Sequence, residues 1–195
     1  MDDELLVENV EQNVKRMFGL NYAPRYPYHN LQHTEMVKAH VTTLSAYYNL
    51  PPSQAATVTI AAWFHDVGQL FGPQDGHEER SILLMEAHLQ QQDAASSFIN
   101  GVSACIAATQ HGKEPQDLLQ QILCDADTWH FGTPYFRQTE FLVKQEMELR
   151  LQKAFAAWHT RSLQMLQQHQ FYTGYCKMHL QKGKQENIEW LQSLQ

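Results

Sequence analysis

The sequence predicts an all-α fold of about eight or nine helices in a single domain. Apolar residues recur with a period close to 3.6 along almost the whole chain, and the alternation typical of strands is nearly absent. Glycine and proline interrupt this pattern at intervals that suit helices of ordinary length. The 195 residues are enough to bury one sizeable core, so one domain over 1–195 is expected.

Seven helices are expected before the C-terminal segment, and one or two more within it. Their approximate ranges are 6–18, 30–48, 53–68, 75–89, 94–110, 115–130 and 134–158. We expect Gly19 to end the first helix, and the prolines within 22–28 to make that segment an extended connection. Asn30 suits the N-cap of the second helix, and the pair Pro51 and Pro52 separates the second helix from the third.

The later boundaries depend on an acidic capping pattern and on further glycine and proline residues. The segment Asp75–Glu78 resembles a capping box at the start of the fourth helix. Gly112 and Pro115 separate the fifth helix from the sixth, and Gly132 with Pro134 separates the sixth from the seventh.

Charge and cysteine content exclude several classes of protein. The net charge of −7 argues against binding to duplex nucleic acid, which needs a basic surface. No apolar stretch is long enough to span a membrane, and the acidic N-terminus is unlike the basic start of a signal peptide. Three widely spaced cysteines without a CxxC pair fit a reducing compartment. We therefore expect a cytoplasmic protein.

Polar residues that could bind a metal lie beside or within apolar helical patterns. His65 and Asp66 follow an apolar run that ends at Phe64, His33 lies upstream, and the pair Asp125 and Asp127 lies downstream. Burying an imidazole and a carboxylate is costly unless another group compensates them. Two histidines and two carboxylates brought together suit a divalent metal.

The helix that carries His65 and Asp66 is expected to loosen where these residues lie. Neighbouring residues on a regular helix point about 100° apart, so they would not normally share one ligand. The segment Val67–Gly68 indicates the end of this helix, and a loosened last turn lets both side chains face one metal. His33 lies in the first turn of its own helix, so we expect a cleft at helix ends.

Four short elements, in this order, resemble those of the HD superfamily of metal-dependent phosphohydrolases. The closer similarity is to its small bacterial predicted phosphohydrolases, with their YHN-x-x-H, FHD, E-x-x-S and DAD elements. These look like Tyr28–His33, Phe64–Asp66, Glu78–Ser81 and Asp125–Asp127. The resemblance covers almost the whole chain. It implies one HD-type domain, with a metal-site core over about 28–132 and C-terminal helices over about 134–195 packing on it.

The resemblance also implies a ligand set and a cofactor. His33, His65, Asp66 and a distal aspartate would bind the metal, and the Ala126-Asp127 context favours Asp127. Asp125 is the alternative ligand, or a partner that orients a histidine. This mixed nitrogen and oxygen set suits Mn, Fe, Co, Ni or Zn, and Mg less well, with one or two ions per chain.

Further residues are candidates for catalysis, substrate binding or a second metal. In some HD enzymes, histidines at comparable places bind a second ion, which makes His77 and His111 candidates for it. Asp66 and Glu78 are expected to hold the attacking water, and His111 to donate a proton to the leaving oxygen. Glu78 has an equally good structural interpretation as part of a capping box. The candidates for substrate binding are His29, Arg80, Lys113 and Arg137.

The resemblance implies a phosphohydrolase that cleaves a phosphomonoester or phosphoanhydride of a nucleotide or other small molecule through a metal-activated water. Two alternatives stay open. One is an HD-fold di-iron oxygenase acting on an organophosphonate or a polyol, and the other is a non-catalytic nucleotide-binding sensor. The partner in each case is a small molecule and not a nucleic-acid duplex or a membrane. The sequence leaves the oligomeric state open.

Overall fold

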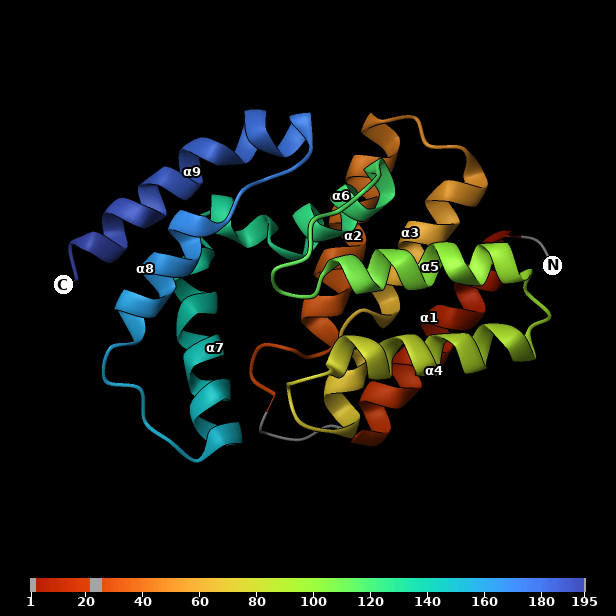
Figure 1. The fold of residues 1–195 in the computed structure, drawn as a ribbon, viewed down its shortest axis with the longest axis horizontal. Coiled ribbons are helices and arrows are strands. Elements are labelled where there is room, and N and C mark those ends of the chain that lie inside the picture. The colour runs from red at the N-terminus through yellow and green to blue at the C-terminus, as the bar shows by residue number, and fades with distance from the viewer. Residues whose placement is uncertain (1–2, 22–25, 195) are drawn as a thin grey trace. The chain divides into compact units, whose positions relative to one another are not determined.

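The computed structural model of the chain describes residues 3–21 and 26–194, and this part is entirely helical apart from turns and loops. It contains nine α-helices, two short 3-10 helices and no strand (Figure 1), which confirms the all-α prediction. The α-helices are α1 (Asp3–Asn21), α2 (Leu31–Tyr47), α3 (Pro52–Phe64), α4 (His77–Gln91), α5 (Ser96–Ala108), α6 (Leu118–Asp127), α7 (Phe136–Leu151), α8 (Trp158–Gln168) and α9 (Gly174–Gln192). The 3-10 helices are η1 (Val67–Phe71) and η2 (Trp129–Gly132).

The chain divides into two compact units. The first unit comprises Met1–Tyr22 and His29–Asp127, and the second comprises Ala23–Tyr28 and Thr128–Gln195. The division after Asp127 lies close to the expected boundary between a metal-site core and C-terminal helices. The expected packing of those helices on the core stays a prediction.

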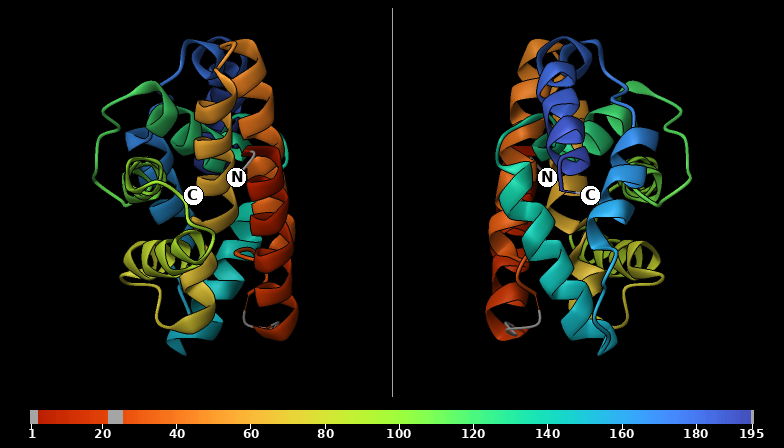
Figure 2. Two further views of the ribbon diagram at one scale, coloured as in Figure 1. Left: turned by 90° about the vertical axis from the view of Figure 1, so that its right-hand side faces the viewer. Right: turned by 90° about the vertical axis from the view of Figure 1, so that its left-hand side faces the viewer.

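Helix α3 is central to the first unit. It contacts α1, α2, α5 and α6, and Figure 2 shows α1 and α2 alongside it. Its second half is apolar on every side, and the run from Ile60 to Phe64 is almost completely buried. A helix that is apolar all round is stable only when neighbours cover it on all sides. This packing fixes the position of the residues that follow Phe64.

The chain loosens directly after α3, as the sequence predicts. His65 and Asp66 form a turn, and η1 then replaces the α-helix. The start of α4 packs tightly against η1 at Gly68. A Cβ atom on Gly68 would lie 2.1 Å from the His77 carbonyl oxygen and 2.8 Å from the Ser81 amide nitrogen. Only glycine allows this approach.

The structure confirms one expected helix boundary of the first unit and corrects two others. Asn30 is the N-cap of α2, and its side chain accepts a hydrogen bond from the His33 amide at 3.2 Å, as predicted. The capping box at Asp75 is wrong, because the N-cap of α4 is Gly76, in a left-handed conformation with φ of 72°. Gly19 does not end α1, which continues to Asn21. The expected connection over 22–28 lies partly outside the described residues.

The second unit consists of η2 and the helices α7, α8 and α9. Helix α9 packs against both η2 and α8, which lies beside it in Figure 1. The long helix expected to reach about Trp158 ends earlier, at Leu151, because Gln152 takes a left-handed conformation with φ of 51°. The Phe155 amide then donates to Glu148 Oε1 at 2.9 Å and holds the reversed chain. The sixth predicted helix also ends earlier than expected, at Asp127, and η2 follows it.

A buried carboxylate anchors the N-terminal segment of the second unit. Glu146 on α7 accepts a hydrogen bond from the Tyr28 amide at 3.0 Å and pairs with Arg150 at 3.1 Å. Glu146 is 1% exposed, so both contacts are shielded from water.

Along residues 3–21 and 26–194, no helix combines the length and the apolar character that crossing a bilayer requires.

Candidate metal centre

Four side chains of the first unit converge where three helices end. His33 Nε2 and His65 Nε2 lie 3.3 Å apart. Asp127 Oδ1 lies 3.1 Å from His33 Nε2 and 3.6 Å from His65 Nε2. Asp66 Oδ2 lies 3.4 Å from His33 Nε2 and 3.3 Å from His65 Nε2. The structure therefore brings together all four residues for which metal binding is expected.

Each of these side chains owes its position to a helix terminus. His33 lies in the first turn of α2, which the Asn30 cap fixes. His65 and Asp66 occupy the turn after α3, and Asp127 is the last residue of α6. Both histidines and Asp66 are buried, whereas 28% of the Asp127 side chain is exposed. This is the arrangement at helix ends that the sequence predicts.

The donor atoms form an electron-rich site that needs a positive charge. His65 Nδ1 lies 2.8 Å from the Ala62 carbonyl, which can only accept, so Nδ1 carries the hydrogen and donates it. A neutral His65 therefore directs the lone pair of Nε2 toward the carboxylate oxygens of Asp66 and Asp127. A proton on an imidazole or a bound cation offsets the negative charge of the two carboxylates at this point. Fixing one ring nitrogen on a backbone carbonyl is typical of metal-binding histidines.

The spacing of the donor atoms also fits a metal ion. Chosen ligand atoms of His33, His65 and Asp127 all lie within 4.8 Å of one another, so this group can hold one ion. Ligand atoms in adjacent positions at about 2.1 Å from a metal are roughly 3 Å apart. The distances from the two imidazole nitrogens to each other and to the carboxylates of Asp66 and Asp127, from 3.1 to 3.6 Å, need only a slight contraction to reach this value.

Electrostatic interactions shift the pKa values of these groups in opposite directions. Burial lowers the pKa of His65, but the Asp66 and Asp127 carboxylates outweigh it and raise this pKa well above its ordinary value. The pKa of His33 is raised for the same reasons. Burial favours neutral Asp66, but His65 and the other nearby imidazoles hold its pKa well below the usual range. The pKa of Asp127 is lowered in the same way. The raised pKa values favour protonation of these imidazoles, and a bound cation would take the place of the protons.

The second oxygen of Asp66 faces a different set of groups. Asp66 Oδ1 lies 3.1 Å from His77 Nε2 and accepts a hydrogen bond of 3.3 Å from Gln69 Nε2. His77 Nδ1 lies 2.9 Å from the Gln74 carbonyl and 3.2 Å from Glu78 Oε2. The two oxygens of Asp66 therefore join the His33 and His65 pair to His77. Gln69 is absent from the sequence-based site, and its only signal is its spacing of three residues after Asp66 on η1.

The structure places two other predicted site residues close to this cluster and gives Arg80 a structural role. The ring of His29 meets the ring of His33 edge-on, with centroids 5.8 Å apart. Glu78 is buried beside His77. Arg80 donates hydrogen bonds to the carbonyls of Gly68, Asp75 and Pro73. Its guanidinium therefore holds the loop that precedes α4.

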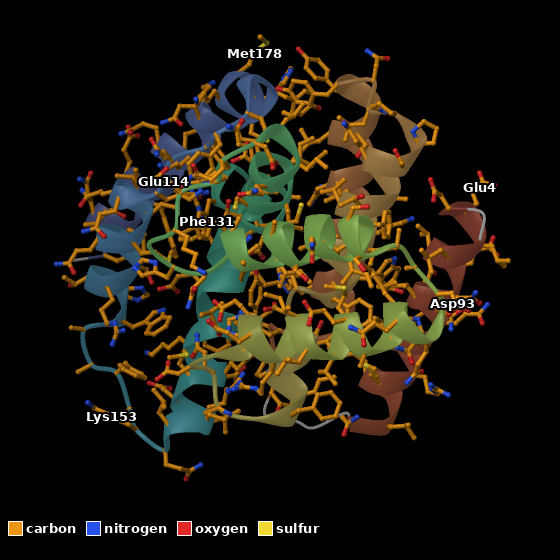
Figure 3. All side chains as sticks on the ribbon, turned by 45° about the vertical axis from the view of Figure 1, so that its right-hand side comes forward. Glu4, Asp93, Glu114, Phe131, Lys153 and Met178 are labelled. Atoms are coloured by element: carbon orange, nitrogen blue, oxygen red, sulfur yellow. The ribbon has the colours of Figure 1, made fainter. Side chains whose placement is uncertain are left out.

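Two further predicted residues of the first unit are exposed. His111 and Lys113 are in the exposed turn between α5 and α6, where Glu114 is labelled in Figure 3. In the described part of the chain, neither side chain makes a hydrogen bond or ion pair with the cluster. Arg137, in the second unit, packs over Trp190 at 5.3 Å. Asp125 is fully buried on α6, and Asp127 is the residue of this acidic pair whose carboxylate reaches His33 and His65.

Comparison with known proteins adds no family. A scan against protein-family models finds no match, and searches of curated proteins and of solved structures find none either. The fold and the site define an all-α protein with a buried histidine and aspartate group that can hold a metal ion. The similarity to HD phosphohydrolases is a similarity of motifs.

Proposed function

We propose that this chain is a metal-dependent phosphohydrolase that cleaves a phosphomonoester or a phosphoanhydride of a small molecule such as a nucleotide. The observation that carries the proposal is the convergence of His33, His65, Asp66 and Asp127 at the ends of α2, α3 and α6. A divalent metal bound there supplies a water of lowered pKa and withdraws charge from a phosphoryl group.

The donor set favours a transition metal for this role. Two imidazoles and two carboxylates balance the charge of one divalent ion and suit Mn, Fe, Co, Ni or Zn. The fixed Nδ1 of His65 presents Nε2 to the site before any ion binds. A preformed site of this kind needs little rearrangement when it is loaded.

Residues around the donors orient them. Gln69 donates to Asp66 Oδ1 and His77 Nε2 lies against the same oxygen, so the carboxylate keeps Oδ2 toward His33 and His65. Glu78 and the Gln74 carbonyl both lie against His77 Nδ1 and fix the direction of that ring. Glu78 therefore acts on the site through His77 in this structure. Its role in holding a water stays a proposal.

The test is hydrolysis by metal-stripped protein reloaded with each metal in turn. We expect phosphate release from one or more nucleotides or sugar phosphates with at least one of Mn, Fe, Co, Ni and Zn. His65→Ala and Asp66→Ala should lose both metal binding and activity, whereas His179→Ala, an exposed histidine on α9, should keep them. Refusal of all five metals by the wild-type protein, or full activity of His65→Ala, would contradict the proposal.

One contact favours a second candidate, a dinuclear oxygenase. His77 Nε2 lies 3.1 Å from Asp66 Oδ1, which places a third imidazole against the second oxygen of one of the four donors. His111, the other expected ligand of a second ion, lies in the exposed turn after α5. Two irons per chain, with oxygen consumption on an organophosphonate or polyol and no phosphate release, would favour the oxygenase over the phosphohydrolase.

A further inference from the structure

The turn that carries His65 and Asp66 interrupts the backbone hydrogen bonding of its helix. In a continuous α-helix the Gly68 amide would donate to Phe64, and in a 3-10 helix it would donate to the His65 carbonyl. In the structure the Gly68 amide donates to Ser81 Oγ at 2.8 Å. Ser81 Oγ in turn donates to the His65 carbonyl, also at 2.8 Å. One hydroxyl from α4 is therefore inserted between two backbone groups that would otherwise bond directly.

We propose that Ser81 is a positioning residue that keeps this turn open, so that His65 and Asp66 face the same metal ion. The inference rests on the proposed function and deepens it, because it names what holds the metal-binding pair in place. A side chain that inserts into the hydrogen-bond ladder of a helix is one of the known causes of a local break. The break matters here because consecutive residues on an intact helix point in different directions.

The surroundings of Ser81 support this role. Ser81 is completely buried, so its hydroxyl makes these contacts out of reach of bulk water. The preceding residue, Arg80, donates from Nε to the Gly68 carbonyl at 3.1 Å. His77, one turn earlier on α4, lies against Asp66 Oδ1. The first turns of α4 therefore hold the metal-binding turn through its backbone and through the Asp66 side chain.

The close approach at Gly68 makes these contacts possible. A Cβ at this position would meet the His77 carbonyl and the Ser81 amide at less than 3.0 Å. The absence of a side chain lets α4 lie directly on the turn, within reach of a hydroxyl as short as that of serine. Ser81 and Gly68 therefore work as a pair, one supplying the inserted group and the other the space for it.

A purely structural role for Ser81 makes different predictions from a positioning role. If the hydroxyl only satisfies buried backbone groups, Ser81→Ala lowers stability but leaves the geometry of the bound metal unchanged. If it positions the pair, Ser81→Ala also weakens metal binding and changes the ligand field of a bound Co²⁺ ion. The ligand field therefore distinguishes the two roles.

The experiment compares the full-length wild-type protein with Ser81→Ala, Ser81→Cys and Ser81→Thr. The matched control is Ser45→Ala, because Ser45 is buried in the same unit and its hydroxyl has no hydrogen-bond partner among the described residues. Calorimetry gives the dissociation constant for Co²⁺, and the visible spectrum reports its ligand field. Hydrogen exchange of the Gly68 amide in the metal-free protein reports the inserted hydroxyl independently of any metal.

We expect Ser81→Ala to bind Co²⁺ about 10- to 100-fold more weakly, with a changed spectrum and faster exchange at Gly68. Ser81→Thr keeps the hydroxyl and should keep the wild-type spectrum, and Ser45→Ala should match the wild type. The thiol in Ser81→Cys is similar in size but is only a weak hydrogen-bond donor, so this variant must also bind Co²⁺ more weakly than the wild type. It provides the test if Ser81→Ala does not fold. Wild-type affinity and spectrum in Ser81→Ala or in Ser81→Cys would overturn this inference alone. A wild-type protein that binds no metal would overturn the proposed function as well.

Discussion

Replacement of Gly68 by alanine tests the packing that positions His65 and Asp66 at the candidate metal centre. The added Cβ would lie 2.1 Å from the His77 carbonyl oxygen and 2.8 Å from the Ser81 amide nitrogen. Both are backbone atoms, so α4 has to move away from η1 by roughly 1 Å or more to reach van der Waals distance. The two hydrogen bonds of Ser81 Oγ, now 2.8 Å each, would then be stretched beyond the normal range.

The expected cost follows from these two effects. Overpacking a buried site costs about 1–3 kcal/mol, and each lost hydrogen bond costs about 0.5–1.5 kcal/mol. Gly68→Ala should therefore lower the free energy of unfolding by about 2–6 kcal/mol. It should also weaken metal binding, because the packing of α4 on η1 at Gly68 also holds His65 and Asp66 in place.

The matched control for this substitution is Gly19→Ala on α1. A Cβ at Gly19 would meet no heavy atom within 4 Å, so alanine there should stabilise the helix by up to about 1 kcal/mol. Urea denaturation of the metal-free proteins, followed by circular dichroism, gives both values. A Gly68→Ala variant as stable as the wild type would refute the packing of α4 on η1. Reduced stability with unchanged metal affinity would refute the link from that packing to the site.

Three further predictions concern acidity and the second unit. Burial, with a contribution from His33, lowers the pKa of His40 to about 4, so the unfolded chain binds a proton that the folded chain rejects between about pH 6.5 and pH 4. The free energy of unfolding should therefore fall as the pH falls from 6.5 to 4. Urea denaturation at these two pH values should show that His40→Gln reduces this fall by about 1–3 kcal/mol. A variant with the same pH dependence as the wild type would contradict the prediction. Because the pKa values of His33 and His65 are raised, metal binding should displace protons from these imidazoles. Calorimetry should show the metal affinity rising about tenfold per pH unit for each proton released. A metal affinity that does not change with pH near neutrality would contradict this prediction. Glu146→Ala removes the buried carboxylate that pairs with Arg150 and accepts from the Tyr28 amide, and it should cost about 3–5 kcal/mol in a denaturation experiment. A loss below about 1 kcal/mol would contradict the shielding of this carboxylate.

The sequence was sufficient to predict the helical fold and to name the four residues that converge at the candidate site. The 3.6-residue period depends only on which face of each helix is buried, so most helices could be located from it. The four residues could be named because four short motif elements occur in the order of the resemblance, and the helical periodicity alone did not single them out. The loosened turn at His65 and Asp66 followed from the divergence of neighbouring side chains on a regular helix.

The groups that orient the donors could not be predicted, because their roles depend on how helices pack. Ser81 belongs to the Glu78–Ser81 motif element, but it bonds to backbone atoms 13 and 16 residues away, and the motif does not indicate these contacts. Arg80 is a residue type that often binds phosphate, yet its guanidinium donates hydrogen bonds to carbonyls of the preceding loop. The early end of α7 depends on the left-handed conformation of Gln152, for which a glutamine gives no signal.

X-ray absorption of the protein loaded with one equivalent of Zn²⁺ or Co²⁺ tests the central claim most directly. We predict a shell of nitrogen and oxygen ligands that includes two imidazoles, from His33 and His65, and that loses one imidazole in His65→Ala. A sulfur ligand, a shell without imidazole, or the failure of the wild-type protein to bind either ion would contradict a metal centre at these residues.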